Sequence, residues 1–170
     1  VYDALSSKGS SEQMQLNNQD PLQEDLQPLI NHYNKGQLHR ALSEADLLLE
    51  RFPNSVILHD ICGASNSGLR QFPAAISNYK KALEINPYYA DAYLNMGAAQ
   101  KEEGDLEDAI ESYKKALKIK PDYAEAYSNI SVIMQDKGDL EAAIKNCKQA
   151  IRLKPGYADA YYNMGYCSSG

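Results

Sequence analysis

A period of 34 residues governs this sequence. Tyr93, Tyr127 and Tyr161 are spaced by that interval. The same interval aligns Asn95, Asn129 and Asn163; Ala41, Ala75, Ala109 and Ala143; Ala82, Ala116 and Ala150; and Pro53, Pro87, Pro121 and Pro155. Periods of this length are typical of two-helix repeats, which bury their apolar faces only by stacking on their neighbours. The sequence therefore predicts an all-α stack of helical hairpins.

The most regular copy of the repeat, residues 90–123, resembles the tetratricopeptide repeat (TPR). The first helix has an aromatic at its fourth position and then a large aliphatic followed by Gly, and a Gly-Asp turn leads to Ala-Ile, Tyr-x-Lys-Ala-Leu and Pro. The residues that carry the resemblance are Tyr93, Met96, Gly97, Gly104, Ala109, Tyr113, Ala116 and Pro121. The resemblance implies a right-handed superhelical solenoid of helix-turn-helix repeats. It also implies a role in binding other proteins.

The repeat pattern divides the chain into six segments. Residues 1–20 are rich in Ser, Gln and Asn, so we expect a flexible lead-in there. The last segment ends after one helix, which suggests a piece of a longer protein. The expected segments are 1–20 (lead-in), 21–55 (a divergent TPR-like repeat), 56–89, 90–123 and 124–157 (TPRs), and 158–170 (the first helix of an incomplete TPR).

Glycine positions give two local expectations. Glycines occupy the turn inside most hairpins, at 36, 104 and 138, but Arg70 takes this place in one of them. Because non-glycine residues avoid the left-handed backbone conformation, we expect Gly68 to supply it slightly earlier. The small residue of the first helix, such as Gly97, is expected to lie against an alanine of the second helix, such as Ala109, so that the two helices approach closely.

Composition and charge exclude several classes of function. The formal net charge of −6 disfavours nucleic acids and anionic lipids as partners. No apolar run is long enough to span a membrane. Cys62, Cys147 and Cys167 lack metal-ligand spacing, and we expect them to be free thiols in a reducing, cytoplasmic setting. No catalytic motif, metal site or cofactor site is predicted, so we expect a non-catalytic protein.

The resemblance places the ligand site on the concave face of the stacked repeats. In TPR proteins, defined positions of each first helix line this face. The corresponding residues here are Asp91, Leu94, Asn95, Ala98 and Lys101; Glu125, Ser128, Asn129 and Val132; and Asp159, Tyr162 and Asn163. This is the predicted groove for a protein or peptide partner.

Asn95, Asn129 and Asn163 recur at one groove position. An Asn side chain offers both a donor and an acceptor, so a row of them can hold the peptide groups of an extended chain. The arrangement resembles the asparagine-lined TPR superhelix of O-linked N-acetylglucosamine transferases. Asn is also common at this position in TPRs generally, where it can simply bond to a neighbouring helix. Both interpretations stay open at this point.

Charge narrows the class of ligand. The charged residues at groove positions are acidic except for Lys101; the acidic ones are Asp60, Asp91, Glu102, Glu125, Asp136 and Asp159. This disfavours the two-carboxylate clamp by which some TPR domains bind acidic chaperone tails, because that clamp needs Lys and Arg. We therefore expect an extended segment that is neutral or basic.

Two alternatives remain beside this interpretation. One is the substrate-targeting region of a longer enzyme of the glycosyltransferase or sulfotransferase type. The other is a self-assembling architectural scaffold, in which a homo-oligomer forms through the unfinished C-terminal repeat. The residues that would mediate such self-association are Tyr161, Met164 and Tyr166.

Overall fold

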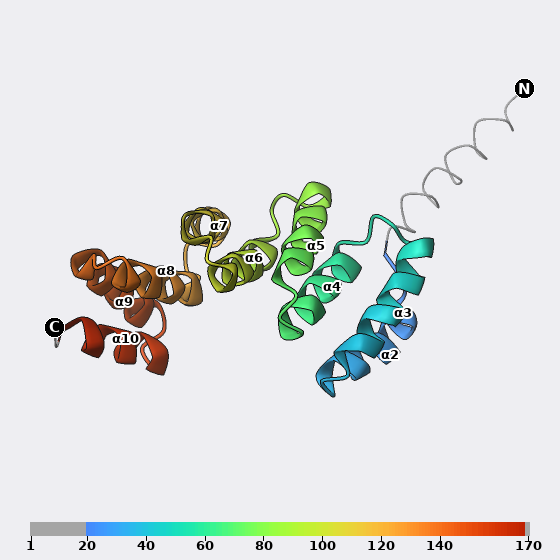
Figure 1. The fold of residues 1–170 in the computed structure, drawn as a ribbon, viewed down its shortest axis with the longest axis horizontal. Helices are drawn as coiled ribbons and strands as arrows, with labels where there is room; N and C mark the ends of the chain where they lie inside the picture. The colour runs from blue at the N-terminus through green and yellow to red at the C-terminus, as the bar shows by residue number, and fades with distance from the viewer. Residues whose placement is uncertain (1–19, 169–170) are drawn as a thin grey trace, which may run out of the picture. The chain divides into compact units, whose positions relative to one another are not determined.

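The computed structural model describes residues 20–168, and within this range it is helical with no strand. The first four described helices are α2 (Gln23–Asn34), α3 (Leu38–Arg51), α4 (Val56–Gly68) and α5 (Phe72–Ile85). They are followed by α6 (Ala90–Glu103), α7 (Leu106–Ile119), α8 (Ala124–Asp136), α9 (Leu140–Leu153) and α10 (Ala158–Ser168) (Figure 1). The predicted all-α class is confirmed. The expected lead-in, apart from Asp20, lies outside the described residues.

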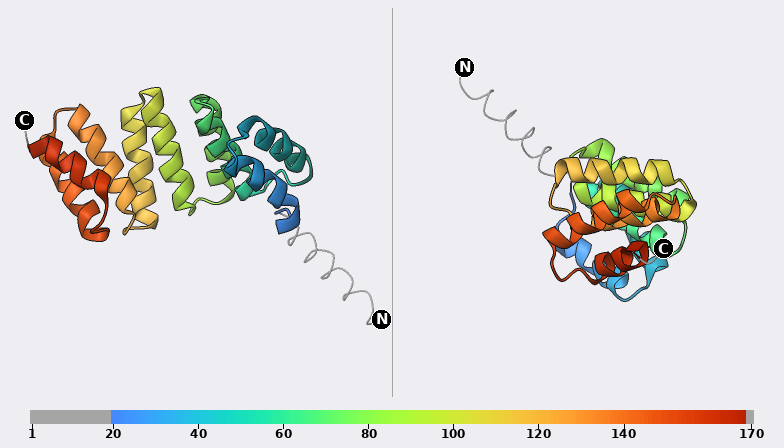
Figure 2. Two further views of the ribbon diagram at one scale, coloured as in Figure 1. Left: turned by 90° about the horizontal axis from the view of Figure 1, so that it is seen from below. Right: turned by 90° about the vertical axis from the view of Figure 1, so that its left-hand side faces the viewer.

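The chain forms two compact units, which we describe separately. The first ends at Pro87 and the second begins at Tyr88. In each unit, consecutive helices joined by short turns pair as antiparallel hairpins (Figure 2). The first unit has a core of Leu26, Leu29, Ala41, Ala45, Leu58 and Cys62. The second has a core of Leu94, Ala109, Ile110, Tyr113, Ala126, Ile130 and Ile133.

The turns inside the hairpins share one backbone geometry. In each, an amide N–H donates to the carbonyl five residues earlier at 2.8–2.9 Å; the pairs are Gln37–His32, Gln71–Asn66, Asp105–Gln100 and Asp139–Met134. The residue before the donor has a positive φ in all four, and in the second turn this residue is Arg70, with φ of 59°. The expectation for Gly68 is therefore wrong. The closing hydrogen bond fixes the left-handed position, and Arg70 adopts it despite its side chain. Gly68 instead lies close to Leu38, whose Cδ1 is 2.6 Å from where a Cβ would stand.

A tyrosine ring lies against a glycine in two of the hairpins. A Cβ added to Gly97 would stand 2.8 Å from Cε1 of Tyr113, and one added to Gly63 would stand 2.5 Å from Cε1 of Tyr79. The nearest side chain to Gly97 is thus Tyr113, rather than the expected Ala109. In the hairpin of α8 and α9 the corresponding residues are Ser131 and Cys147, both fully buried. A larger residue on the first helix accompanies a smaller one on the second, which offsets part of the change in volume at the contact.

The outer face of α2 is polar where the corresponding face of α8 is apolar. Ala126 and Ile130 of α8 belong to the core that includes Ile110 and Tyr113 of α7. Three periods earlier, α2 carries Glu24 and Pro28, both exposed. They line a shallow hollow of about 890 Å³ together with Leu22, Gln23, Gln27, Asn31, His32 and Lys35. This face suits contact with water, as in a terminal repeat that ends an apolar core.

Adding volume at Gly97 is expected to destabilise the second unit. Gly97→Ser would force the new side chain into the Tyr113 ring and cost about 1–3 kcal/mol. Tyr113→Cys alone would leave a cavity and cost about 2–4 kcal/mol. The double variant reproduces the Ser131–Cys147 pair. Its loss of stability should therefore be smaller than the sum of the two single losses by at least about 1 kcal/mol.

Urea denaturation of the single and double variants measures this coupling. Gly156→Ala is the control, because nothing lies within 4 Å of its added Cβ. Additive losses would contradict the assigned contact.

Replacing Tyr113 with Phe tests the buried hydroxyl. This oxygen has no hydrogen-bond partner among the described residues, so Tyr113→Phe should leave stability at pH 7 unchanged or raise it by up to about 1 kcal/mol. Burial, and then the charge of Glu102, raise the pKa of Tyr113 above its ordinary value. Protonation of Tyr113 therefore favours the folded state. Below about pH 10 this effect is complete, and at higher pH the free energy of unfolding falls because Tyr113 ionises first in the unfolded chain.

Between neutral pH and about pH 11, the free energy of unfolding should accordingly fall less steeply with pH in Tyr113→Phe than in the wild type. Tyr162→Phe, at a tyrosine that is 76% exposed, controls for the loss of a phenol. Equal slopes for wild type and Tyr113→Phe would disprove this assignment.

Candidate peptide-binding surface

In the second unit, the first helix of each repeat lies in one layer; these helices are α6, α8 and α10. Helix α8 contacts both α6 and α10, in addition to its own hairpin partner α9. All twelve predicted groove residues lie on these three helices: Asp91, Leu94, Asn95, Ala98 and Lys101 on α6; Glu125, Ser128, Asn129 and Val132 on α8; and Asp159, Tyr162 and Asn163 on α10. The layer therefore collects the candidate residues from three successive repeats.

The three asparagines are half-buried but differ in their partners. Asn163 donates through Nδ2 to Oγ of Ser128 at 3.4 Å. The side chains of Asn95 and Asn129 make no hydrogen bond to any residue in the range 20–168. Asn163 thus bonds to a neighbouring helix, while the other two retain their full donor and acceptor capacity.

Several of the predicted residues contribute little accessible surface. Leu94 is 8% exposed and Ser128 is 2% exposed, so both support the layer from within. Ala98 and Val132 are half-buried. Tyr162 is 76% exposed. Lys101 lies 3.8 Å from a carboxylate oxygen of Glu102, which partly neutralises the one cation among the predicted residues.

Three carboxylates mark the N-terminal ends of these helices. Asp91, Glu125 and Asp159 are the second residues of α6, α8 and α10, and all three are exposed. An acidic residue here is stabilised by the helix dipole, which is sufficient to explain each one structurally. Together they also give this edge of the layer a negative potential, which attracts cationic groups.

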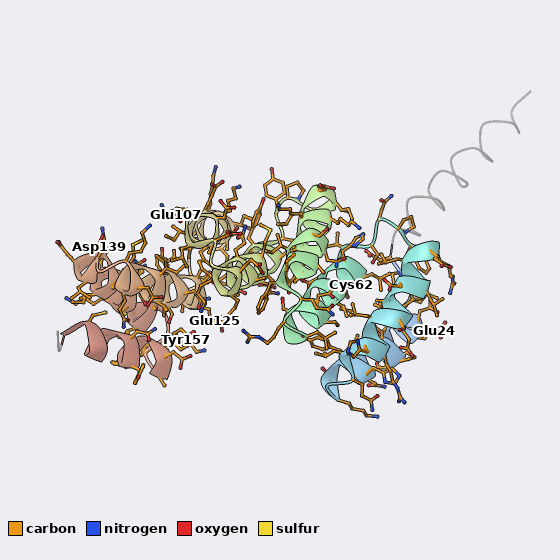
Figure 3. All side chains as sticks on the ribbon, viewed as in Figure 1. Glu24, Cys62, Glu107, Glu125, Asp139 and Tyr157 are labelled. Carbon is orange, nitrogen blue, oxygen red and sulfur yellow. The ribbon has the colours of Figure 1, made fainter. Side chains whose placement is uncertain are left out.

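Two tyrosines in the inter-repeat loops join this edge. Tyr123 donates from its hydroxyl to Asp91 at 2.6 Å. Burial, the hydrogen bond to Asp91, and the charges of Asp91 and Glu125 raise the pKa of Tyr123. Burial, Glu125 and Asp159 raise the pKa of Tyr157, and a hydrogen bond with Ser128 opposes them. Figure 3 shows Glu125 and Tyr157 at neighbouring ends of α8 and α10.

These loop tyrosines were not predicted from the sequence. A lysine lies over each ring, Lys120 at 4.2 Å from the Tyr123 centroid and Lys154 at 4.8 Å from that of Tyr157. The signal in the sequence is the recurring Lys-Pro-x-Tyr at 120–123 and 154–157. Such cation–π contacts hold the rings in place at the entrance to α8 and α10.

The residues expected to mediate self-association lie on α10. Tyr161 is 48% exposed and Met164 is half-buried. The side chain of Tyr166 lies outside the described part of the structure. Gly165, which corresponds to Gly97 in the repeat, has no atom within 4 Å of an added Cβ. The ring contact that Gly97 makes with Tyr113 therefore has no counterpart on α10 within residues 20–168.

Within residues 20–168, neither a metal site nor a membrane span stands beside this layer. This range holds no group of three or more His, Cys, Asp or Glu side chains arranged to hold a metal ion. None of its helices is both long and apolar enough to cross a membrane. Cys62, Cys147 and Cys167 are free and buried, and burial raises the pKa of the Cys62 thiol to about 12. The layer of α6, α8 and α10 is thus the principal candidate.

Comparison with known proteins supports the fold and the family. A family model described as TPR repeat matches residues 70–104, 101–138 and 133–167. The probable UDP-N-acetylglucosamine–peptide N-acetylglucosaminyltransferase SEC of Arabidopsis thaliana is 33% identical over 104 residues, which are 60% of this chain. The matched region spans only 11% of that relative. The resemblance of the repeats to those of O-linked N-acetylglucosamine transferases is confirmed.

Solved structures share the fold at low sequence identity. The crystal structure of MamA protein has a TM-score of 0.77 and 23% identity, covering 85% of this chain and 79% of that one. A chain of the APC/C hetero-tetramer Cut9-Hcn1 also has a TM-score of 0.77, with 17% identity, covering 84% of this chain and 29% of that one. With the family model matching more than half of its residues, this chain belongs to the tetratricopeptide repeat family.

Proposed function

We propose that the layer formed by α6, α8 and α10 binds an extended, neutral or basic polypeptide, and that the protein is a non-catalytic interaction module. TPRs are modules of protein–protein interaction. The observation that carries the proposal is the recurrence of one polar pair on three adjacent helices. Each helix has a carboxylate at its second residue and an asparagine at its sixth.

The spacing of the layer suits a main chain in extended conformation. Packed helices lie about 8–10 Å apart, and an extended chain advances about 3.3 Å per residue. Successive helices would therefore meet the ligand about every third residue. Asparagine amides placed at that interval can bond to peptide groups without selecting side chains. Selectivity would then come from charge.

The charges of the layer favour a basic ligand over an acidic one. Asp91, Glu125 and Asp159 are exposed at one edge. Lys101 interacts with Glu102 on the same helix. Lysine or arginine side chains of a bound segment could pair with the three carboxylates, and this attraction would weaken as salt screens it. The chain's overall charge of −6 further disfavours nucleic acid as the ligand.

Reversing two charges tests the proposal. The double variant Asp91→Lys with Glu125→Lys is expected to lower the affinity for a basic, extended peptide by at least about tenfold at low salt. It should also reduce the salt dependence of binding. The matched control is Asp108→Lys with Glu141→Lys, which makes the same charge change at exposed positions of the second helices α7 and α9.

Fluorescence anisotropy against ionic strength measures both effects. Asp91→Asn with Glu125→Gln removes the charges with little change in shape, and a smaller loss is expected. Equal binding by the wild type and the first double variant would reject the groove.

A second candidate function is that of a substrate-targeting region in a longer enzyme. The favouring observation is the similarity to a segment of the Arabidopsis transferase that makes up 11% of its length. In that case the same layer would hold substrate polypeptides for a catalytic domain elsewhere in the protein. The gene sequence on either side of this chain separates the two, because the second candidate requires a transferase domain.

Self-assembly is the third candidate. Tyr161 is 48% exposed, whereas its equivalents Tyr93 and Tyr127 are half-buried. If α10 packs against another copy, light scattering should show association that rises with concentration. Tyr161→Lys with Met164→Glu should then remain monomeric throughout, and a wild type that is monomeric at every concentration would eliminate this candidate.

A further inference from the structure

The two junctions between first helices in the second unit differ at one buried position. Between α8 and α10, Oγ of Ser128 accepts from Nδ2 of Asn163 at 3.4 Å. Ser128 is 2% exposed, so water does not compete freely for this oxygen. One period earlier, the position of Ser128 is occupied by Leu94, which has no polar atom to offer.

The loop tyrosines differ in the same way. Tyr157 interacts with Ser128 by a side-chain hydrogen bond. Tyr123, one period earlier, donates to Asp91 at 2.6 Å instead. Ser128 therefore links α8 to two places, Tyr157 in the loop before α10 and Asn163 on α10 itself. With a leucine at the equivalent position, the earlier junction has no such connection.

This difference decides which asparagines can serve a ligand. A side-chain amide has two N–H donors and one acceptor oxygen. The bond to Ser128 uses one donor of Asn163 and orients the whole group toward α8. Asn129 faces no acceptor at the corresponding place, and its amide has no hydrogen bond within residues 20–168. A ligand can bond to Asn129 without first breaking a bond inside the protein.

From this we infer that the three asparagines are not equivalent: Asn129 binds the backbone of the ligand, and Ser128 is a positioning residue that keeps Asn163 as a structural link between α8 and α10. The ligand's backbone would then be held across α6 and α8, where Asn95 is the second available amide. The inference rests on the proposed function for the identity of the ligand, but the state of the asparagines can be measured without one.

The first measurement is hydrogen exchange of the Asn side-chain amides by ¹⁵N NMR in the unliganded protein. The NH₂ protons of Asn163 should exchange severalfold more slowly than those of Asn129. Ser128→Ala should remove the difference by accelerating Asn163 alone. Ser112→Ala is the matched control, because it removes another buried hydroxyl, which donates to Gln100 at 2.7 Å. Equal exchange in the wild type, or no response to Ser128→Ala, would overturn the inference.

The second measurement uses a fluorescein-labelled peptide of about twelve alternating lysines and threonines, a composition that favours extended backbone. Asn129→Ala should weaken binding about fivefold, the worth of one hydrogen bond, and Asn163→Ala less than about twofold. In a Ser128→Ala background, Asn163→Ala should lower the peptide affinity about as much as Asn129→Ala does. Ser128→Leu, which copies Leu94, serves as a second way to free Asn163. Equal losses for the two asparagines in the wild type would contradict the inference.

The two arms fail independently. A wild type that does not bind the peptide would refute the proposed ligand class. The exchange experiment would still decide the inference about Ser128 and the asparagines.

Discussion

In two of the hairpins, the packing of an aromatic ring against a glycine sets how closely the two helices approach. Tyr79 on Gly63 and Tyr113 on Gly97 bring each second helix against its first at a distance that a single added methyl group would change. In the second unit, this contact holds α6 against α7, whereas Ser131 and Cys147 take its place between α8 and α9. The position of Asp91 on α6 therefore depends in part on the contact that holds α6 against α7.

Because each repeat buries its apolar face only on its neighbours, function has to be built on the remaining faces. The core of the second unit uses Ile110 and Tyr113 of α7 together with Ile130 of α8. On α2 the equivalent of Ile130 is Pro28, beside Glu24, and both are exposed. The same helical surface is thus a core in one repeat and a water-facing boundary in another. The difference arises from a few side chains, with no change in the backbone pattern.

The period predicted the helices and hairpins, because equivalent residues in a repeat occupy equivalent places, and the family resemblance then assigned the candidate residues to the first helix of each repeat. It did not predict Arg70 in a left-handed conformation, since a preference of about 1–2 kcal/mol is outweighed by the hydrogen bond that closes the turn. It left open whether the asparagines bond to a neighbouring helix and did not identify Ser128 as the partner of Asn163, because this contact joins different positions of two repeats. Tyr123 and Tyr157 were overlooked because they lie in loops, outside the helical positions that define the family.

Within the second unit, two departures from the repeat lie on α8. Ser131 takes the place of glycine where Cys147 takes the place of tyrosine, and its hydroxyl donates to the carbonyl of Ser128 at 2.6 Å. The exchange of volume inside the hairpin and the polar link to α10 are thus connected through one turn of one helix. A leucine at 128 would remove the link to Asn163, and a glycine at 131 would remove the hydroxyl bond beneath it. Under the proposed function, the differences between neighbouring repeats, rather than the shared pattern, would determine where along the layer a polypeptide backbone finds hydrogen-bond partners.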